Sequence, residues 1–188
     1  MTDFLLAHES AVRLGCFGAV LLAMMGWEWR RPRRVLHLPR SRRWIANLGI
    51  VVVDSAVVRL VFPVLVVGLA GLAEAEGWGL FHWLNAPFWV AFITSLLLLD
   101  LTIYAQHVAF HKIPLLWRLH RMHHTDLDFD ATTALRFHPL EIALSMLIKL
   151  AVVGLLGAPP VAVLVFEVVL NATAMFNHGN VGLSPQLD

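Results

Sequence analysis

Apolar residues in this chain form long blocks separated by short polar stretches. Three blocks, at about residues 11–29, 44–73 and 87–106, are long enough for an α-helix to cross roughly 30 Å of hydrocarbon. A fourth, from 140 to 176, is interrupted by glycine and proline, which end helices. We therefore expect an out-and-back hairpin of two short helices there, over 140–157 and 159–176. The pattern predicts an all-α integral membrane helical bundle that forms a single membrane domain over residues 1–188.

Composition agrees with a membrane protein and excludes several other classes. The chain is 59% hydrophobic and 14% charged, whereas soluble domains are nearer half apolar and a quarter charged. A net charge of +1 gives no general attraction to nucleic acid. Cys16 is the only cysteine, so an internal disulfide and a CxxC pair are both excluded. No GxGxxG or GxxxxGK[ST] motif indicates a nucleotide-binding loop.

An arginine-rich loop joins the first two apolar blocks, with the sequence WRRPRRVLHLPRSRRW. A nucleic-acid patch is one interpretation, but short basic loops between membrane spans are typical of the cytoplasmic side. We favour the second interpretation. Following the spans from this loop places residues 107–138 on the cytoplasmic side, and the hairpin returns His178 to it.

Five histidines follow the third apolar block, in the stretch HVAFHKIPLLWRLHRMHH. At 100° per residue, Asp100, Tyr104, His107 and His111 share one helix face. Pro114 ends that helix and suits the first position of a new one. On the new helix, His120, His123 and His124 have i, i+3, i+4 spacing and so share a face.

Two helices joined by a tight break thus present five imidazoles to one volume, which predicts a metal site. Imidazole suits zinc, copper, iron and nickel, so the residues leave the metal open. Five ligands are too many for one tetrahedral zinc and indicate two metals or a higher coordination number. Asp126, Asp128 and Asp130 could add carboxylates, but we interpret them as a solvated loop.

Several stretches carry a family resemblance. They are DLTIYAQHVAFHKIPLLWRLHRMHHTD, TTALRFHPLEI, FNHGN and, upstream, WEWRRPRRVLHLPRSRRWIANLGI. Together they resemble the fatty acid hydroxylase superfamily, which includes sterol desaturases and C-4 sterol methyl oxidases. The resemblance implies an integral membrane protein holding two non-haem irons that uses O2 to hydroxylate or desaturate a lipid C–H bond.

The resemblance also implies which residues form the site. The metal ligands would be His107, His111, His120, His123, His124 and His178. His138 matches a recurrent family position and is either a ligand or a structural histidine. Asp100 and Tyr104 would orient imidazoles through hydrogen bonds. No catalytic residue apart from the ligands is expected, and the remaining histidines, His8, His37 and His82, match nothing.

The chain departs from the family pattern at its end. Family members carry a third HxxHH cluster soon after the FNHGN-like motif, whereas this sequence stops at NVGLSPQLD. Two irons held mainly by imidazole need roughly eight ligands, and only six or seven are assigned. We therefore expect the C-terminal part of the family domain to be missing and the ligand set to be incomplete, and an inactive fragment is one expected outcome.

The expected function is that of an iron-dependent membrane monooxygenase in lipid biosynthesis, acting on a sterol or fatty acyl substrate. Its electrons would come from an external cytochrome or ferredoxin-type donor, since no flavin or nicotinamide motif is present. Three alternatives remain. A metal transporter would string its ligands through several spans, and a bis-histidine haem protein would use only two of them. The third is a non-catalytic membrane protein that keeps the scaffold.

Overall fold

Helices make up 77% of the chain in the computed structural model, which describes residues 2–184 and 186. Among those residues there is no strand, and one isolated bridge joins Pro32 to Val181. The α-helices are α1 (Thr2–Ala7), α2 (Glu9–Arg30), α3 (Arg40–Val61), α4 (Val66–Glu76), α5 (Leu80–Trp83), α6 (Phe88–Lys112), α7 (Pro114–His120), α8 (Pro139–Leu156) and α9 (Pro160–Asn177). Two 3₁₀ helices, η1 (His123–Thr125) and η2 (Ala131–Leu135), lie between α7 and α8.

Five segments in the described part of the chain are long and apolar enough to cross a membrane: α2, the stretch from α3 to α5, α6, α8 and α9. The protein is therefore a multi-pass integral membrane protein of the all-α class. One predicted span differs in detail, because residues 44–73 form two helices rather than one. Pro63 disfavours helix at the residue before it, and Phe62 is accordingly extended (φ −115°, ψ 105°), which ends α3.

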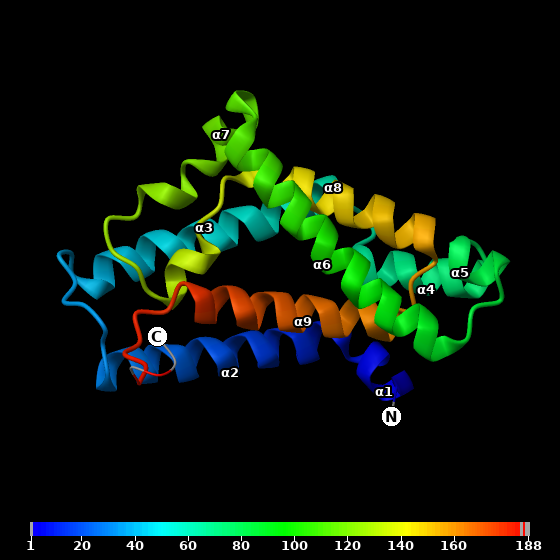
Figure 1. Cartoon of the computed structure of the whole chain (residues 1–188), viewed down its shortest axis with the longest axis horizontal. Coiled ribbons are helices and arrows are strands. Elements are labelled where there is room, and N and C mark those ends of the chain that lie inside the picture. The colour runs from blue at the N-terminus through cyan, green and yellow to red at the C-terminus, as the bar shows by residue number, and fades with distance from the viewer. Residues whose placement is uncertain (1, 185, 187–188) are drawn as a thin grey trace.

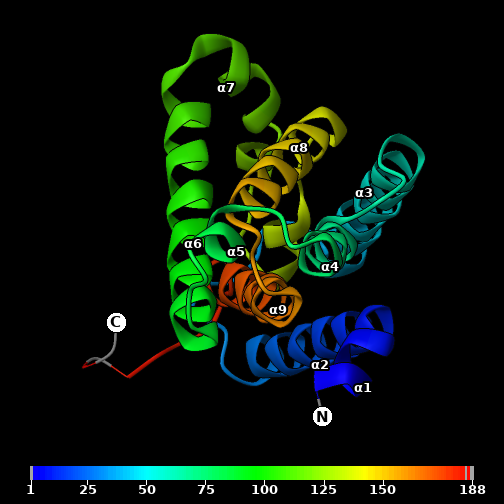
Figure 2. The same cartoon turned by 90° about the vertical axis from the view of Figure 1, so that its right-hand side faces the viewer.

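Helix α9 lies at the centre of the bundle. It packs against α2, α4, α6 and η2, and Figures 1 and 2 both show α2 running alongside it. Small and branched side chains of α9, including Ala162, Val163 and Leu164, are buried there. The hydrophobic block over 159–176 thus supplies the apolar face that packs closely against the neighbouring helices.

The turn between α8 and α9 is fixed by two glycines at one end of the bundle. A Cβ on Gly79 would lie 2.3 Å from the backbone nitrogen of Gly157, and both residues have positive φ (98° and 64°). The two segments can approach this closely only because neither carries a side chain. This close approach sends α9 back toward the end of the bundle from which α8 begins.

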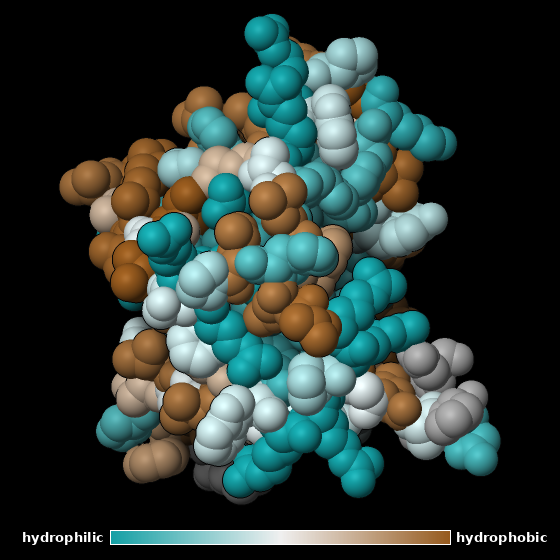
Figure 3. Space-filling view, turned by 90° about the vertical axis from the view of Figure 1, so that its left-hand side faces the viewer, coloured by the Kyte–Doolittle hydropathy of each residue, from teal (hydrophilic) through white to brown (hydrophobic). Residues whose placement is uncertain are grey.

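The opposite end of the bundle is polar. The arginine-rich loop, the start of α3 and the end of α9 meet there (Figure 1), and hydrophilic side chains gather on that face (Figure 3). The backbone N–H of Gly182 donates to Arg31 and that of Arg33 donates to Asn180, so the segment after α9 lies along the loop after α2. This is the end to which the hairpin returns His178.

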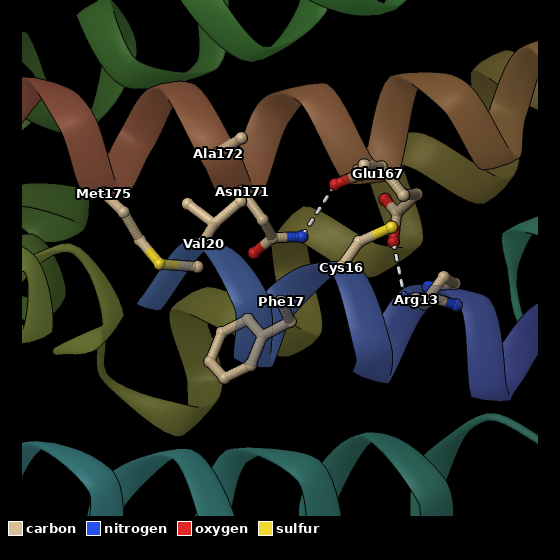
Figure 4. Close-up of a pocket in the computed structure, with 9 residues that line it drawn as sticks. Arg13, Cys16, Phe17, Val20, Glu167, Asn171, Ala172 and Met175 are labelled. Carbon is tan, nitrogen blue, oxygen red and sulfur yellow. Dashed lines mark hydrogen bonds and ion pairs between the residues drawn. The ribbon is translucent and has the colours of Figure 1, made fainter. Parts of the chain in front are cut away.

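A charged group also lies inside the bundle, where Glu167 of α9 meets Arg13 of α2 (Figure 4). Glu167 of α9 accepts from Arg13 of α2 (2.8 Å) and from Lys149 of α8 (2.5 Å), and its backbone carbonyl accepts from Asn171. A carboxylate buried among apolar helices needs such partners. The group joins three helices and does not touch any of the histidines singled out above.

Candidate metal centre

Four imidazoles converge where α6 passes into α7. His107 and His111, one turn apart on α6, have their Nε2 atoms 3.1 Å apart. His120, the last residue of α7, and His124 in η1 have theirs 3.3 Å apart. The rings of His107 and His111 each lie 4.8 Å from that of His120, and His111 lies 4.9 Å from His124. These four residues are the histidine quartet.

The backbone between the two halves of the quartet bends as proline dictates. Ile113 is extended (φ −93°, ψ 117°) before Pro114, which occupies the first position of α7. This bend folds α7 back so that His120 reaches His107. The predicted break at Pro114 is therefore present.

The prediction that His120, His123 and His124 share one face of one helix is wrong. Helix α7 ends at His120, a turn follows at Arg121 and Met122, and η1 begins at His123. As a result the two adjacent rings, whose centroids are 5.1 Å apart, point to different partners: His124 joins the quartet, whereas His123 stacks on Phe137 at 4.7 Å.

His123 has its own partner, which comes from the far end of the sequence. Its Nε2 lies 2.9 Å from Nε2 of His178, the residue that ends α9. The ring of His123 also lies 5.4 Å from that of His120. His123 and His178 are the histidine pair, and the pair adjoins the quartet.

Three of the six rings are anchored through Nδ1. His120 Nδ1 lies 2.7 Å from Glu141 Oε1, His123 Nδ1 lies 3.3 Å from the carbonyl of Arg136, and His178 Nδ1 lies 2.8 Å from the carbonyl of Ala174. An Nδ1–H that donates to a carboxylate or carbonyl leaves the lone pair on Nε2. In each anchored ring, Nε2 with its lone pair therefore faces another histidine. This arrangement is typical of metal-binding imidazoles.

The separations fit a metal ion. Two imidazole nitrogens about 2.1 Å from one ion, at angles between 90° and 110°, are about 3.0–3.4 Å apart. The three closest Nε2 pairs span 2.9–3.3 Å, and the ligand atoms of His107, His111 and His120 lie within 4.8 Å of one another. Burial, with the neighbouring His178 and His120, lowers the pKa of His123 to about 3. A neutral ring at pH 7 is free to bind a cation.

His138 has a different role from the other candidate ligands. Its Nδ1 accepts from the backbone N–H of Leu140 (3.1 Å), so its side chain caps the start of α8. Among the described residues no ring contact joins it to the quartet or the pair. Of the two roles left open by the sequence, this position matches the structural one.

Asp100 and Tyr104 lie on α6 and are exposed, as His107 and His111 are. Asp100 is exposed and Tyr104 is 65% exposed, and within the described chain neither makes a hydrogen bond to a histidine. The three unmatched histidines also lie apart from the cluster. His8 contacts the carbonyl of Phe4, His82 lies against Gly157, and His37 contacts Asp128.

The prediction of a solvated loop at Asp126, Asp128 and Asp130 is wrong. Asp128 and Asp130 are buried. Arg43 of α3 donates to Asp126 (2.7 and 2.9 Å) and also pairs with Asp130. Nothing in the local sequence indicates that a cation more than 80 positions upstream would reach these carboxylates.

Asp128 is held separately, by the arginine-rich loop. It accepts from the backbone N–H groups of His37 and Leu38, both at 2.9 Å. Burial would raise the pKa of Asp128, but these hydrogen bonds outweigh it and lower the pKa to about 2. The aspartates therefore fasten the loop before η2 to α3 and to the arginine-rich loop.

Sequence reasoning also missed polar residues that contact the histidines or the loops around them. Glu141 anchors His120, and Asn47 accepts from Arg136 at 3.1 Å. Glu28 and Asn180 are hydrogen-bonded to each other and are both buried. Glu141 alone had a recognisable signal, since a carboxylate in an apolar helix needs a partner.

The family model for fatty acid hydroxylase matches residues 92–187, slightly more than half of the chain. The matched stretch contains the quartet, the pair and His138. The chain belongs to the fatty acid hydroxylase family. It is accordingly an enzyme of the membrane lipid hydroxylase type. Comparisons with curated proteins and with solved structures give no match.

Proposed function

We propose that this protein is an iron-dependent oxidoreductase that uses O2 to hydroxylate or desaturate a C–H bond of a fatty acyl or sterol lipid. The observation that carries the proposal is the set of six imidazoles at one end of an apolar bundle, with three rings anchored so that Nε2 faces another ring. Membership of the fatty acid hydroxylase family selects iron among the metals that imidazole suits.

Two irons would be held by the two histidine groups. The quartet offers four imidazoles to one ion, and the pair offers two to the other and leaves its remaining positions to further ligands. Bound iron would supply the activation of O2, chemistry that side chains lack. Asp100 and Tyr104, predicted to orient the imidazoles, make no hydrogen bond to a histidine among the described residues, and Glu141 anchors Nδ1 of His120.

The protein's own share is orientation and the exclusion of water. The Nδ1 contacts of His120, His123 and His178 fix the ring planes. Exposed apolar side chains along α6, such as Leu97 and Leu101, face the bilayer. A lipid can therefore approach from the membrane without crossing water.

The electron balance requires a second protein. Hydroxylation takes up O2, two electrons and two protons and releases water, and desaturation has the same requirement. The chain has no flavin or nicotinamide motif, so a cytochrome or ferredoxin-type donor would supply the electrons. The arginine-rich loop lies at the same end of the bundle as the end of α9, and by the positive-inside rule we propose that this end faces the cytoplasm.

The geometry favours this enzyme over the two other metal-binding functions. A transporter would distribute its ligands along a path near the midplane, whereas these gather at one end. A bis-histidine haem needs two axial nitrogens about 4 Å apart, one on each side of the iron. The close Nε2 pairs lie only 2.9–3.3 Å apart.

The test is turnover in lipid nanodiscs supplied with ferrous iron, a reduced carrier protein and ¹⁸O2. Mass spectrometry should find a lipid that gains one ¹⁸O or loses two hydrogens, and a chelator or His120→Ala should abolish it. The matched control is His8→Ala, which lies outside the cluster and should retain activity. Lipid turnover that survives His120→Ala would contradict the proposal, and turnover with NAD(P)H but no carrier protein would contradict the external donor.

A further inference from the structure

We propose that Glu28, in the last turn of α2, is a positioning residue for the histidine pair. The inference rests on the proposed function, because it takes His123 and His178 as metal ligands. Glu28 lies outside the stretch that the family model matches. It acts without touching either ring, by holding together the two loops that set their separation.

One carboxylate oxygen of Glu28 contacts both loops. Its Oε1 accepts from the backbone N–H of Ala131 (2.7 Å) and from that of Asn180 (2.8 Å). The side chain is buried, with 1% of the residue exposed. Hydrogen bonds from backbone N–H groups to a carboxylate are among the stronger ones in proteins.

The first of these loops leads to His123. Ala131 begins η2, which ends at Leu135, and the carbonyl of the next residue, Arg136, accepts from His123 Nδ1. The guanidinium of Arg136 also donates to Asn47 of α3 (3.1 Å) and to the carbonyl of Met122 (3.1 Å). A shift of Ala131 would therefore move the group that anchors His123.

The second loop carries His178. Asn180 follows it by two residues, and its side chain bonds Arg34 in both directions: Oδ1 accepts from the Arg34 N–H (2.9 Å), and Nδ2 donates to the Arg34 carbonyl (2.8 Å). Between them, Gly179 packs so tightly on α2 that a Cβ would lie 2.4 Å from Met24 Cε. The end of α2 thus fixes the segment beyond His178.

The separation of the two Nε2 atoms in the pair depends on where these loops sit relative to each other. Metal ligands must be placed within about half an ångström to bind well. The second oxygen of Glu28, Oε2, is buried and has no hydrogen-bond partner among the described residues. What the position requires is therefore one acceptor oxygen rather than a negative charge, and glutamine should replace glutamate.

The test compares Glu28→Ala, Glu28→Gln and Arg13→Ala. Arg13→Ala is the matched control, because it removes another α2 side chain that bonds to a different helix, far from the histidines. Two readouts are taken in detergent: backbone hydrogen exchange of residues 126–136 and 177–183, and Co²⁺ binding followed by its visible spectrum. His178→Ala identifies which part of the Co²⁺ binding belongs to the pair.

Glu28→Ala should speed exchange in both segments and weaken the pair's Co²⁺ about tenfold or more, with the quartet's Co²⁺ unchanged. Glu28→Gln should keep both the exchange rates and the Co²⁺ binding of the wild type, and so should Arg13→Ala. Unchanged exchange in Glu28→Ala, or an equal loss of all Co²⁺ in Glu28→Ala and Arg13→Ala, would overturn the inference. Faster exchange in Glu28→Ala together with no Co²⁺ binding by the wild type would overturn the metal site, and with it the positioning role, while showing that Glu28 does hold the two loops together.

Discussion

The two sides of the metal centre are built differently. His107 and His111 project from one long helix, are exposed, and contact each other at Nε2. His123 lies in the short 3₁₀ helix η1 and His178 at the C-terminal end of α9, and each is anchored through Nδ1 to a backbone carbonyl. Helix geometry sets the first side, and hydrogen bonds from α2 and α3 set the second.

This difference between the two sides predicts which substitutions should affect only one ligand and which should affect several. A substitution on the α6 side alters one ligand and leaves the helix as it was. On the loop side, the Arg43–aspartate contacts, Asn47 and Glu28 are linked, so a substitution there should disturb ligands that it does not touch.

The largest effect is expected at His120, which belongs to both sides. It is 0% exposed, its ring contacts both α6 histidines and His123, and Glu141 anchors it. His120→Ala should lower iron affinity and turnover by at least about 100-fold. Metal analysis and the ¹⁸O2 assay check this, and retention of full iron content in the variant would contradict it.

The next effect is on folding, at Arg43. Arg43→Met keeps the side-chain volume but leaves Asp126 and Asp130 buried without their cation. We expect the free energy of unfolding to fall by about 3–5 kcal/mol, measured by denaturant titration in detergent micelles. Arg59→Met, on the exposed side of the same helix, is the control and should change it little. Equal stability of the two variants would show that the loop side does not depend on this ion pair.

A smaller effect is expected when one anchor is weakened. Glu141→Gln keeps an acceptor for His120 Nδ1 but removes the charge that strengthens the contact. Iron affinity should fall about tenfold, as measured by competition with a chelator. Glu74→Gln, exposed at the other end of the bundle, should leave it unchanged. A Glu141→Gln variant with wild-type iron affinity would show that the charge of Glu141 does not contribute to iron binding.

The smallest effect is a pH dependence at Asp128. The pKa of this carboxyl is depressed from 3.8 to about 2 in the folded protein, so its stabilising effect is present above pH 3.8 and is lost as the pH falls toward 2. Asp128→Asn should remove a slope on the order of 1–2 kcal/mol between pH 4 and pH 2. Unfolding free energies of the two proteins across that range test it, and parallel curves would contradict it.

The sequence predicted the α6 side of the metal centre better than the side that carries His123 and His178, because only the α6 side depends on local signals. The HxxxH spacing and Pro114 are local signals, and they placed His107, His111 and the break before α7. The side chains that hold the loops around His123 and His178, those of Glu28, Arg43 and Asn47, lie far from these loops in the sequence, and periodicity carries no information on such contacts. The aspartates looked solvated because Arg43, their partner, lies more than 80 positions away.

Asp100 and Tyr104 show the limit of helical periodicity. Their spacing places them on the stripe of His107 and His111, and all four residues are exposed, yet among the described residues neither Asp100 nor Tyr104 is hydrogen-bonded to a histidine. Periodicity gives the angle around one helix and not the direction of its neighbours. Glu141, on a different helix, occupies the role that they were expected to fill.

The most direct test of the central claim is the iron content per chain of wild type, His111→Ala and His178→Ala, measured by elemental analysis during a chelator titration. The account predicts up to two irons in the wild type, with the pair's iron leaving first because it has fewer histidine ligands. His178→Ala should lose only that weaker iron, whereas His111→Ala should lose the tighter one. A wild type without iron, or iron that neither variant disturbs, would contradict the account.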